Sequence, residues 1–286
     1  MRILVTGGTG FVGSALVPRL IEAGHDVFCA CRPGSVAPFG QTVGWNMTGP
    51  TATAGLPEAV DGIVHLAQSR SYRNFPTDSR EMFEVNVAAT MSLLEWAART
   101  KVARFCLVSS GTVYEPFSGP LHEDAAVSPN SFMGASKLAS ENIAKPFSSI
   151  FGLSVLRLFF PFGPNQKDRL IPDLIRRVRT GEAVHVTSEG EGMLLTPTFV
   201  DDIVEVILTG LEESWTGTKN VASPEALSIR QIADAIGRQL GKAPRLEVFP
   251  RQPVSIVPSL DRLAERFDLR RFARFEDGLA RTIGRV

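Results

Sequence analysis

The most restrictive feature of the chain is a set of three glycines near its N-terminus. Gly7, Gly10 and Gly13 stand three residues apart, after a predicted apolar strand, Arg2–Val5, and before a predicted amphipathic helix, Ser14–Ala23. Such a turn uses glycine where the backbone bends, where it lies against a pyrophosphate and where the helix presses on the strand. The N–H groups at the helix start can face phosphates. The pattern predicts a dinucleotide-binding turn; the alternative is a purely structural one.

Apolar strands and helices alternate along the first half of the chain. This alternation predicts an α/β protein with a doubly wound parallel sheet, in which ligands bind beyond the carboxyl ends of the strands. The predicted strands are Arg2–Val5, Val27–Cys31, Gly62–Ala67, Arg104–Ser109 and Ser154–Phe160, and later helices span Ser79–Thr100 and Gly134–Lys145.

The second half is less regular and predicts a smaller lobe. We expect residues 1–165 to form the dinucleotide-binding domain, to which the chain returns at about 198–222, and residues 166–197 and 223–286 to form a small α+β lobe for substrate. The predicted elements here are helices at Leu170–Thr180, Val200–Leu211, Ser228–Leu240 and Phe275–Ile283, and strands at Ala183–Thr187 and Leu246–Phe249.

Composition narrows the function classes. Thirty basic and thirty acidic residues give a formal net charge of zero, so we expect no nucleic-acid or membrane partner. No apolar stretch approaches the ~20 residues of a membrane span, and the first strand leaves no room for a signal peptide, so we expect a cytoplasmic protein. Cys29, Cys31 and Cys106 are too few for a disulfide framework or a zinc site, and we expect no metal.

Further motifs follow the glycine turn in a fixed order and give the chain a family resemblance. They are His65-Leu66-Ala67, Asn86-Val87, Ser109-Ser110 with Val113-Tyr114, Lys137 in Gly-x-Ser-Lys, Arg157 to Pro164, and Phe199-Val200-Asp201-Asp202. The set resembles the extended short-chain dehydrogenase/reductase family, in its NAD(P)-dependent nucleotide-sugar epimerase/dehydratase branch. The resemblance implies a Rossmann fold, hydride transfer on a nucleotide-sugar or related small molecule, and a homodimer formed through helices near Glu84–Thr100 and Gly134–Lys145.

The family's acid–base chemistry uses a tyrosine four residues before a lysine, with a serine or threonine bonded to the same substrate oxygen. The resemblance assigns the lysine to Lys137 and the hydroxyl to Ser110. Met133 occupies the tyrosine position, and its thioether has no proton to exchange. We therefore expect the catalytic set Ser110, Lys137 and Met133, with the chemistry of the tyrosine lost.

Three interpretations of Met133 stay open. The enzyme can use another acid or base, with Lys137, Tyr114, Glu123 or a bound water as candidates. The chain can instead be a non-catalytic NAD(P)-binding or sensor protein of the same fold. Finally, the methionine can be a change introduced at this position. The motifs do not distinguish epimerisation, dehydration and reduction.

The resemblance also implies a cofactor site. No carboxylate ends the second strand, where Cys31 and Arg32 stand, and an arginine there suits the extra phosphate of NADP, so we favour NADP over NAD. Phe160 replaces an asparagine common in the family, and His65 is expected to line the cofactor. The predicted cofactor-binding residues are Gly7, Gly10, Phe11, Val12, Gly13, Arg32, Asn46, Met47, Leu66, Ala67, Lys137, Phe160 and Pro161.

The substrate site is the least determined part. Leu195 stands where this branch usually has a diphosphate-binding arginine, so Arg70 and Arg73 become candidates for anion binding; the alternative is a solvated loop. Asn86 matches an asparagine that orders the active site, or it caps a helix. The predicted substrate residues are Arg70, Arg73, Asn86, Ser110 and Tyr114.

Overall fold

The computed structural model describes residues 1–47, 53–71, 74–119, 121–187, 189–250, 252 and 254–284. The chain forms two compact units, which are treated separately below. Unit 1 comprises Met1–Pro116, Ala126–Leu158 and Val204–Lys219; unit 2 comprises Phe117–Ala125, Phe159–Ile203 and Asn220–Val286.

A seven-stranded sheet forms the centre of unit 1, in the order β11-β6-β5-β4-β1-β2-β3. The pairings from β6 through β3 are parallel. Most strands are buried along nearly their whole length because their apolar residues face helices on both sides. The strands are β1 Arg2–Thr6, β2 Asp26–Cys31, β3 Gln41–Gly44, β4 Gly62–His65, β5 Arg104–Ser110, β6 Gly152–Leu158 and β11 Gly217–Val221.

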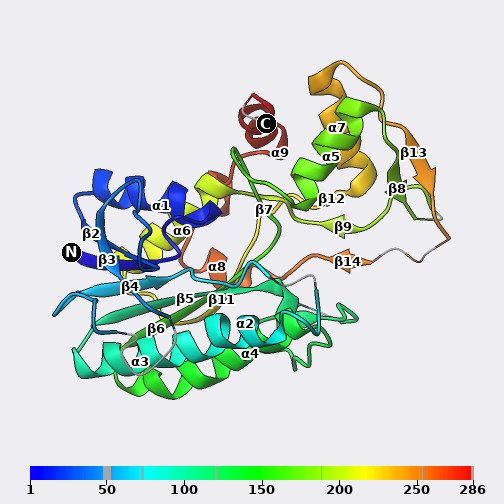
Figure 1. Ribbon diagram of the computed structural model, residues 1–286. Helices are drawn as coiled ribbons and strands as arrows, with labels where there is room; N and C mark the ends of the chain where they lie inside the picture. Colours follow the sequence, from blue (N-terminus) through cyan, green and yellow to red (C-terminus); the bar gives the residue numbers. More distant parts are fainter. Residues whose placement is uncertain are drawn as a thin grey trace. The chain divides into compact units, whose positions relative to one another are not determined.

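Helices cover both faces of this sheet (Figure 1). α1 (Phe11–Glu22) and the part of α6 (Val200–Glu212) that belongs to unit 1 lie on one face, joined by an ion pair between Arg19 and Glu205. α2 (Ser79–Phe83), α3 (Ala89–Arg99) and α4 (Phe132–Ala144) lie on the other face. This arrangement confirms the predicted doubly wound parallel sheet. The core between the sheet and the second helical layer includes Leu4, Ile63, Leu93, Phe105 and Leu153.

Three local differences from the predicted elements have physical causes. β3 and β11 were not predicted because their sequences, QTVG and GTKNV, carry little apolar signal. The single helix predicted over Ser79–Thr100 is interrupted by a π-helical turn at Glu84–Ala88. Asn86 lies inside this turn, so the helix-cap alternative for Asn86 is wrong.

Unit 2 is built from short strands and helices. α7 begins with a capping box between Ser228 and Gln231 and ends at Gly241, whose φ of 65° is left-handed. The strands are β7 Pro161–Phe162, β8 Val184–Val186, β9 Leu194–Leu195, β10 Thr198–Phe199, β12 Leu227–Ser228, β13 Leu246–Val248 and β14 Ser255–Ile256. The helices are α5 Leu170–Thr180, α7 Ile229–Leu240, α8 Asp261–Ala264 and α9 Phe275–Ile283.

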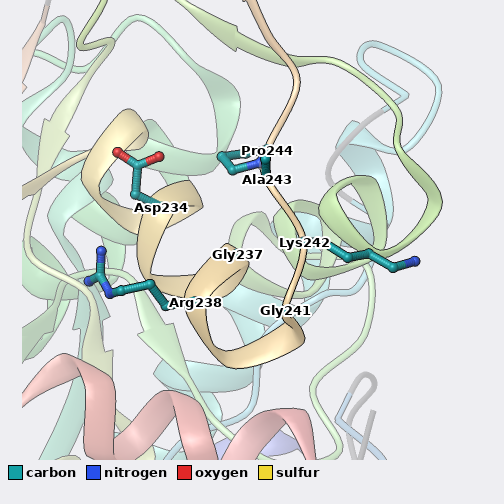
Figure 2. A pocket seen from close by; sticks show the side chains of 7 residues that line it. All are labelled: Asp234, Gly237, Arg238, Gly241, Lys242, Ala243 and Pro244. Carbon is teal, nitrogen blue, oxygen red and sulfur yellow. The ribbon is translucent and has the colours of Figure 1, made fainter.

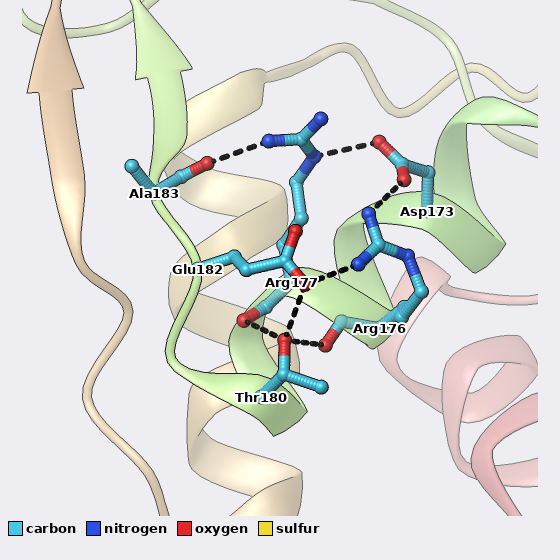
Figure 3. Close-up of polar contacts among 6 residues, drawn as sticks. All are labelled: Asp173, Arg176, Arg177, Thr180, Glu182 and Ala183. Atoms are coloured by element: carbon cyan, nitrogen blue, oxygen red, sulfur yellow. Dashed lines mark hydrogen bonds and ion pairs between the residues drawn. The ribbon is translucent and has the colours of Figure 1, made fainter.

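An ion-pair network covers one side of α5 (Figure 3). Asp173 accepts hydrogen bonds from Arg177 Nε at 2.7 Å and from Arg176 Nη2 at 2.8 Å. Arg176 also pairs with Glu182, and Arg177 donates to the carbonyl oxygen of Ala183 at 2.9 Å. These arginines are therefore engaged by carboxylates and backbone of their own unit, and such exposed pairs stabilise a fold only slightly.

Candidate functional site

The glycine turn between β1 and α1 is sterically demanding at two of its glycines. Gly7 has a left-handed φ of 69°, and a Cβ at this position would lie 2.8 Å from the backbone nitrogen of Ala67. A Cβ at Gly13 would lie 2.2 Å from the carbonyl oxygen of Gly7. Both positions therefore require glycine for the fold itself, since real Cβ atoms do not approach backbone so closely.

Gly10 is different and points to a ligand. It precedes the first turn of α1, and a Cβ there would meet one atom within 4 Å, the carbonyl oxygen of Gly7 at 3.1 Å. The fold alone thus places a weaker demand on Gly10 than on its two partners. Apart from that one contact the Cβ position of Gly10 is open, and the first-turn N–H groups of α1 have no acceptor inside the helix. The turn therefore fits the pyrophosphate of a dinucleotide. Phe11 and Val12, in the same turn, are partly exposed.

A buried histidine ties this turn to its neighbours. The two ring nitrogens of His65 lie 2.6 Å from Thr6 Oγ1 and 2.9 Å from Thr90 Oγ1, and the Ala67 N–H donates to Thr6 Oγ1 at 3.2 Å. Burial, with the nearby charge of Lys137, lowers the pKa of His65 to about 3, so the ring is neutral. Because both nitrogens are engaged inside the protein, His65 braces Leu66 and Ala67 instead of lining a cofactor surface, which corrects the expectation.

The remaining predicted cofactor residues lie in several environments. Arg32 follows β2 and is exposed, as is Asn46, whereas Met47 packs partly against the core of unit 1. Phe160 and Pro161 belong to unit 2, where the φ of Phe160 is 40°, an unusual conformation for a residue with a side chain.

Ser110 and Lys137 come from β5 and α4 of the same unit. Ser110 is half-buried at the end of β5, where its Oγ accepts hydrogen bonds from Thr112 N at 3.2 Å and Thr112 Oγ1 at 3.0 Å. Lys137 Nζ donates to the carbonyl oxygen of Val108, on the same strand, at 3.0 Å. Burial lowers the pKa of Lys137 to about 8, although the carboxylate of Glu141 acts in the opposite direction. A lysine with such a pKa is suited to exchange protons near neutral pH.

Met133 stands one helical turn before Lys137 and contacts Asn86. The Asn86 Nδ2 atom lies 3.9 Å from the Met133 sulfur and donates to Ser136 Oγ at 2.9 Å. Its Oδ1 accepts from the Ser69 N–H at 2.9 Å. Asn86 thereby links the loop after β4, the π-helical turn and the first two turns of α4, which brings two predicted site residues together.

A buried polar network, which the sequence motifs did not reveal, lies next along α4. Arg157 donates from Nη2 to Glu141 Oε2 at 2.7 Å and from Nη1 to the Tyr114 hydroxyl at 2.7 Å. Burial acts to lower the pKa of Arg157, but the hydrogen bonds and charge of Glu141 outweigh it and raise that pKa. Ser109 Oγ also donates to Glu141. The available signals were an arginine inside an apolar strand and a glutamate four residues after Lys137.

This network supplies Tyr114 with a partner inside the protein. Tyr114 is 6% exposed. Glu141, the carboxylate partner of Arg157, stands two helical turns after Met133 on α4. In unit 2, Glu123 accepts from the Asn220 N–H at 2.8 Å. Contact of Tyr114 with substrate stays a prediction. Arg70 is exposed, and Arg73 lies outside the described residues.

Other regions of the described chain lack comparable chemistry. A shallow hollow in unit 2 lies at the C-terminal end of α7 and has no nucleophile or histidine in its lining (Figure 2). Its lining residues are Asp234, Gly237, Arg238, Gly241, Lys242, Ala243 and Pro244. The described residues contain no group of three or more metal-ligating side chains, and their three cysteines are buried and free. None of the helices in the described ranges is long and apolar enough to cross a membrane.

Comparison with known proteins identifies the family. A model of the NAD dependent epimerase/dehydratase family matches residues 3–222. The chain belongs to this family. This confirms the resemblance to the extended short-chain dehydrogenase/reductases that the motifs indicated.

Proteins similar to this chain are named for different reactions. UDP-glucuronic acid decarboxylase 1 of Danio rerio is 25% identical over 301 residues, covering 99% of this chain and 72% of that protein. UDP-glucose 4-epimerase of Corynebacterium glutamicum is 25% identical over 292 residues, covering 92% and 88%. The structure of MoeE5 in complex with UDP-glucose and NAD is 26% identical, with a TM-score of 0.85 and coverage of 99% and 98%. Family membership therefore spans more than one net reaction.

Proposed function

We propose that this epimerase/dehydratase family member is an oxidoreductase that acts on a nucleotide-sugar or related substrate by transient hydride transfer. The observation that carries the proposal is Lys137, a buried lysine with a pKa lowered to about 8, bonded to the strand that ends at Ser110. The similarity to proteins named as UDP-sugar enzymes supports the substrate class.

In this proposal each residue has a defined task. A bound nicotinamide dinucleotide would accept and return a hydride, and its pyrophosphate would rest on the turn of Gly7, Gly10 and Gly13. Ser110 Oγ would hydrogen-bond the reacting oxygen of the substrate, and Lys137 would exchange protons nearby. Asn86 would hold the first two turns of α4 in place through Ser136.

The cofactor is proposed as NAD or NADP. Arg32, exposed at the end of β2, supports NADP, because a guanidinium can bond the 2′-phosphate. NAD is the dinucleotide in the MoeE5 structure, so both are compared in the experiment below.

The alternative function is a non-catalytic NAD(P)-binding or sensor protein. Met133 favours it, because the residue one turn before Lys137 has no exchangeable proton. In this case the dinucleotide would bind without being reduced by any sugar nucleotide.

Calorimetric titration of nucleotide-stripped protein with NAD and NADP, each with and without a panel of UDP-sugars, tests the proposal. We expect tight dinucleotide binding that one sugar nucleotide strengthens, because the two ligands would occupy adjacent sites in one ternary complex. Dinucleotide binding that is indifferent to every sugar would contradict the substrate class and support the sensor alternative. A protein that binds neither ligand would contradict the whole proposal.

We also propose that residues 166–197 and 223–286 bind the substrate, and that the protein is a cytoplasmic homodimer. Buried free cysteines support a reducing compartment. Phe83 and Met91, 46% and 37% exposed in the α2–α3 region, support a helical dimer interface there. Sedimentation of wild-type protein and of a Phe83→Glu variant tests the dimer.

A further inference from the structure

The site needs a proton acceptor to replace the missing phenol, and the structure offers a new candidate. Of the groups considered from sequence, Tyr114 is bonded to Arg157 and Glu123 to the backbone of Asn220. Lys137 is buried against Val108. A different carboxylate, Glu115, lies between the two elements that carry Ser110 and Met133.

Glu115 is fixed to the Ser110 side through one short turn. Ser110 caps the start of a four-residue 3₁₀ helix, Gly111–Tyr114, and Glu115 ends it. The Glu115 N–H donates to the carbonyl oxygen of Thr112 at 3.2 Å, and Thr112 Oγ1 donates to Ser110 Oγ at 3.0 Å. At a rise of about 2 Å per residue, the five steps from Ser110 to Glu115 span about 10 Å, so a single short turn separates the two residues.

The carboxylate of Glu115 is also fixed to the start of α4. Ser131 Oγ donates to Glu115 Oε2, and the same oxygen of Ser131 caps α4 by accepting the Gly134 N–H at 3.1 Å. Met133 is the second residue of this helix. The glutamate therefore bonds to the cap of the turn in which the family has its tyrosine.

Close packing holds this carboxylate beside the first turn of α4. A Cβ at Gly134 would lie 2.5 Å from the carbonyl oxygen of Thr112, so the 3₁₀ turn and the first turn of α4 are in close contact. Glu115 is half-buried, so part of its surface stays open to solvent. The first turn of α4, Phe132 to Ala135, contains no charged residue.

We propose that Glu115 is the catalytic carboxylate that takes over proton transfer from the tyrosine that Met133 replaces. The inference rests on the proposed hydride-transfer function. The hydroxyl proton of the substrate alcohol passes to the Glu115 carboxylate, and the carbon-bound hydrogen leaves with its electron pair to the oxidised nicotinamide dinucleotide. The substrate becomes a carbonyl compound. The reverse transfer returns both and restores the carboxylate.

The test is a single-turnover measurement of nicotinamide absorbance, with the dinucleotide and sugar nucleotide that wild-type protein binds. Glu115→Gln keeps an oxygen that can accept from Ser131 but loses the basic group. We expect its rate to fall roughly 10²- to 10⁴-fold, with the affinity for the sugar nucleotide changed little. Glu58→Gln, at an exposed glutamate elsewhere in unit 1, is the matched control and should leave the rate unchanged.

Rescue by a tyrosine separates catalysis from positioning. Adding Met133→Tyr to Glu115→Gln should raise the rate about tenfold or more above that of Glu115→Gln alone, because the phenol would stand one turn before Lys137. An unchanged rate in Glu115→Gln overturns the inference. A double variant that is as slow as Glu115→Gln also overturns the inference, because it would assign the loss of rate to a disturbed helix cap at Ser131.

The outcome for wild-type protein distinguishes this inference from the proposed function. Wild-type protein that binds both ligands and transfers no hydride overturns the proposed function, and the role of Glu115 with it. Wild-type protein that transfers hydride at a rate that Glu115→Gln leaves unchanged overturns the role of Glu115 alone. Wild-type protein that binds neither ligand overturns the proposed function itself.

Discussion

The ammonium nitrogen of Lys137 lies 3.0 Å from the carbonyl oxygen of Val108, in a position where the lysine is only 5% exposed. One carbonyl cannot replace the hydration of an ammonium group, so burial lowers the pKa of Lys137 from 10.5 to about 8. The carboxylate of Glu141, one turn later on α4, limits the decrease. The folded protein therefore holds a proton on Lys137 less tightly than the unfolded chain does.

The unfolding free energy of the protein should consequently rise with pH between about pH 8 and 10.5. Below pH 8 both states carry the proton and folding bears the full cost of burying the charge. Between about pH 8 and 10.5 only the unfolded chain keeps it, so the Lys137 contribution to unfolding free energy should increase by about 3 kcal/mol at most. Urea unfolding at several pH values measures the unfolding free energy of wild type and of Lys137→Met. The difference between the two isolates the contribution of Lys137, because the buried cysteines titrate in both proteins and cancel. A difference independent of pH would contradict the lowered pKa.

Gly10 and Gly13 should respond differently to the same substitution. Gly10→Ala adds a Cβ with one contact at 3.1 Å, whereas Gly13→Ala adds one at 2.2 Å from the Gly7 carbonyl oxygen. We expect Gly10→Ala to weaken dinucleotide binding by about tenfold or more with little change in melting temperature. Gly13→Ala should lower both the dinucleotide affinity and the melting temperature. Calorimetry and thermal unfolding measure the two effects. Gly44→Ala in β3, with no atom within 4 Å of the added Cβ, is the control.

Most of the central sheet was predictable because its strands are apolar and bounded by turns. The predicted strands at Arg2–Val5 and Arg104–Ser109 differ from β1 and β5 by one residue at the end. β11 was missed because Gly217–Val221 is polar, and its place in the sheet depends on pairing with distant residues. The π-helical turn at Glu84–Ala88 was also missed, since helical periodicity does not register one extra residue in a turn.

The residues of the candidate site likewise differ in how far the sequence alone could predict them. Ser110 and Lys137 could be predicted because each stands in a short motif at fixed spacing, and their roles stay predictions. The partners of Glu141 were not found, since Ser109, Arg157 and the glutamate come from three elements that only folding brings together. The contact of Ser131 with Glu115 joins a loop to a helix cap and has no periodic signal.

Arg32 should affect the choice of dinucleotide and little else. Its side chain is exposed after β2, so Arg32→Ala should not disturb the fold. If the guanidinium bonds the 2′-phosphate, the variant should lose about tenfold or more in NADP affinity and little in NAD affinity. Calorimetric titration with each dinucleotide measures this, with Arg99→Ala, at the end of α3, as control. Equal losses for both would remove the case for NADP.

The pair of Glu141 and Arg157 should be the most sensitive contact between α4 and the sheet. The side chains of Glu141 and Arg157 are 7% and 6% exposed, with Arg157 Nη2 2.7 Å from Glu141 Oε2. Arg157→Met would leave the carboxylate buried without its partner, which costs about 3–5 kcal/mol of unfolding free energy. Adding Glu141→Leu should recover much of that loss, because a buried ion pair contributes little net stability over apolar residues.

Urea unfolding of the single and double variants tests this expectation. Arg270→Met, which breaks an exposed pair with Asp268 in unit 2, is the control and should cost far less. The double variant should remain below wild type, since the hydroxyls of Ser109 and Tyr114 lose their partners. A cost for Arg157→Met no larger than that for Arg270→Met would mean that apolar packing alone, without the ion pair, holds α4 and Lys137 on the sheet.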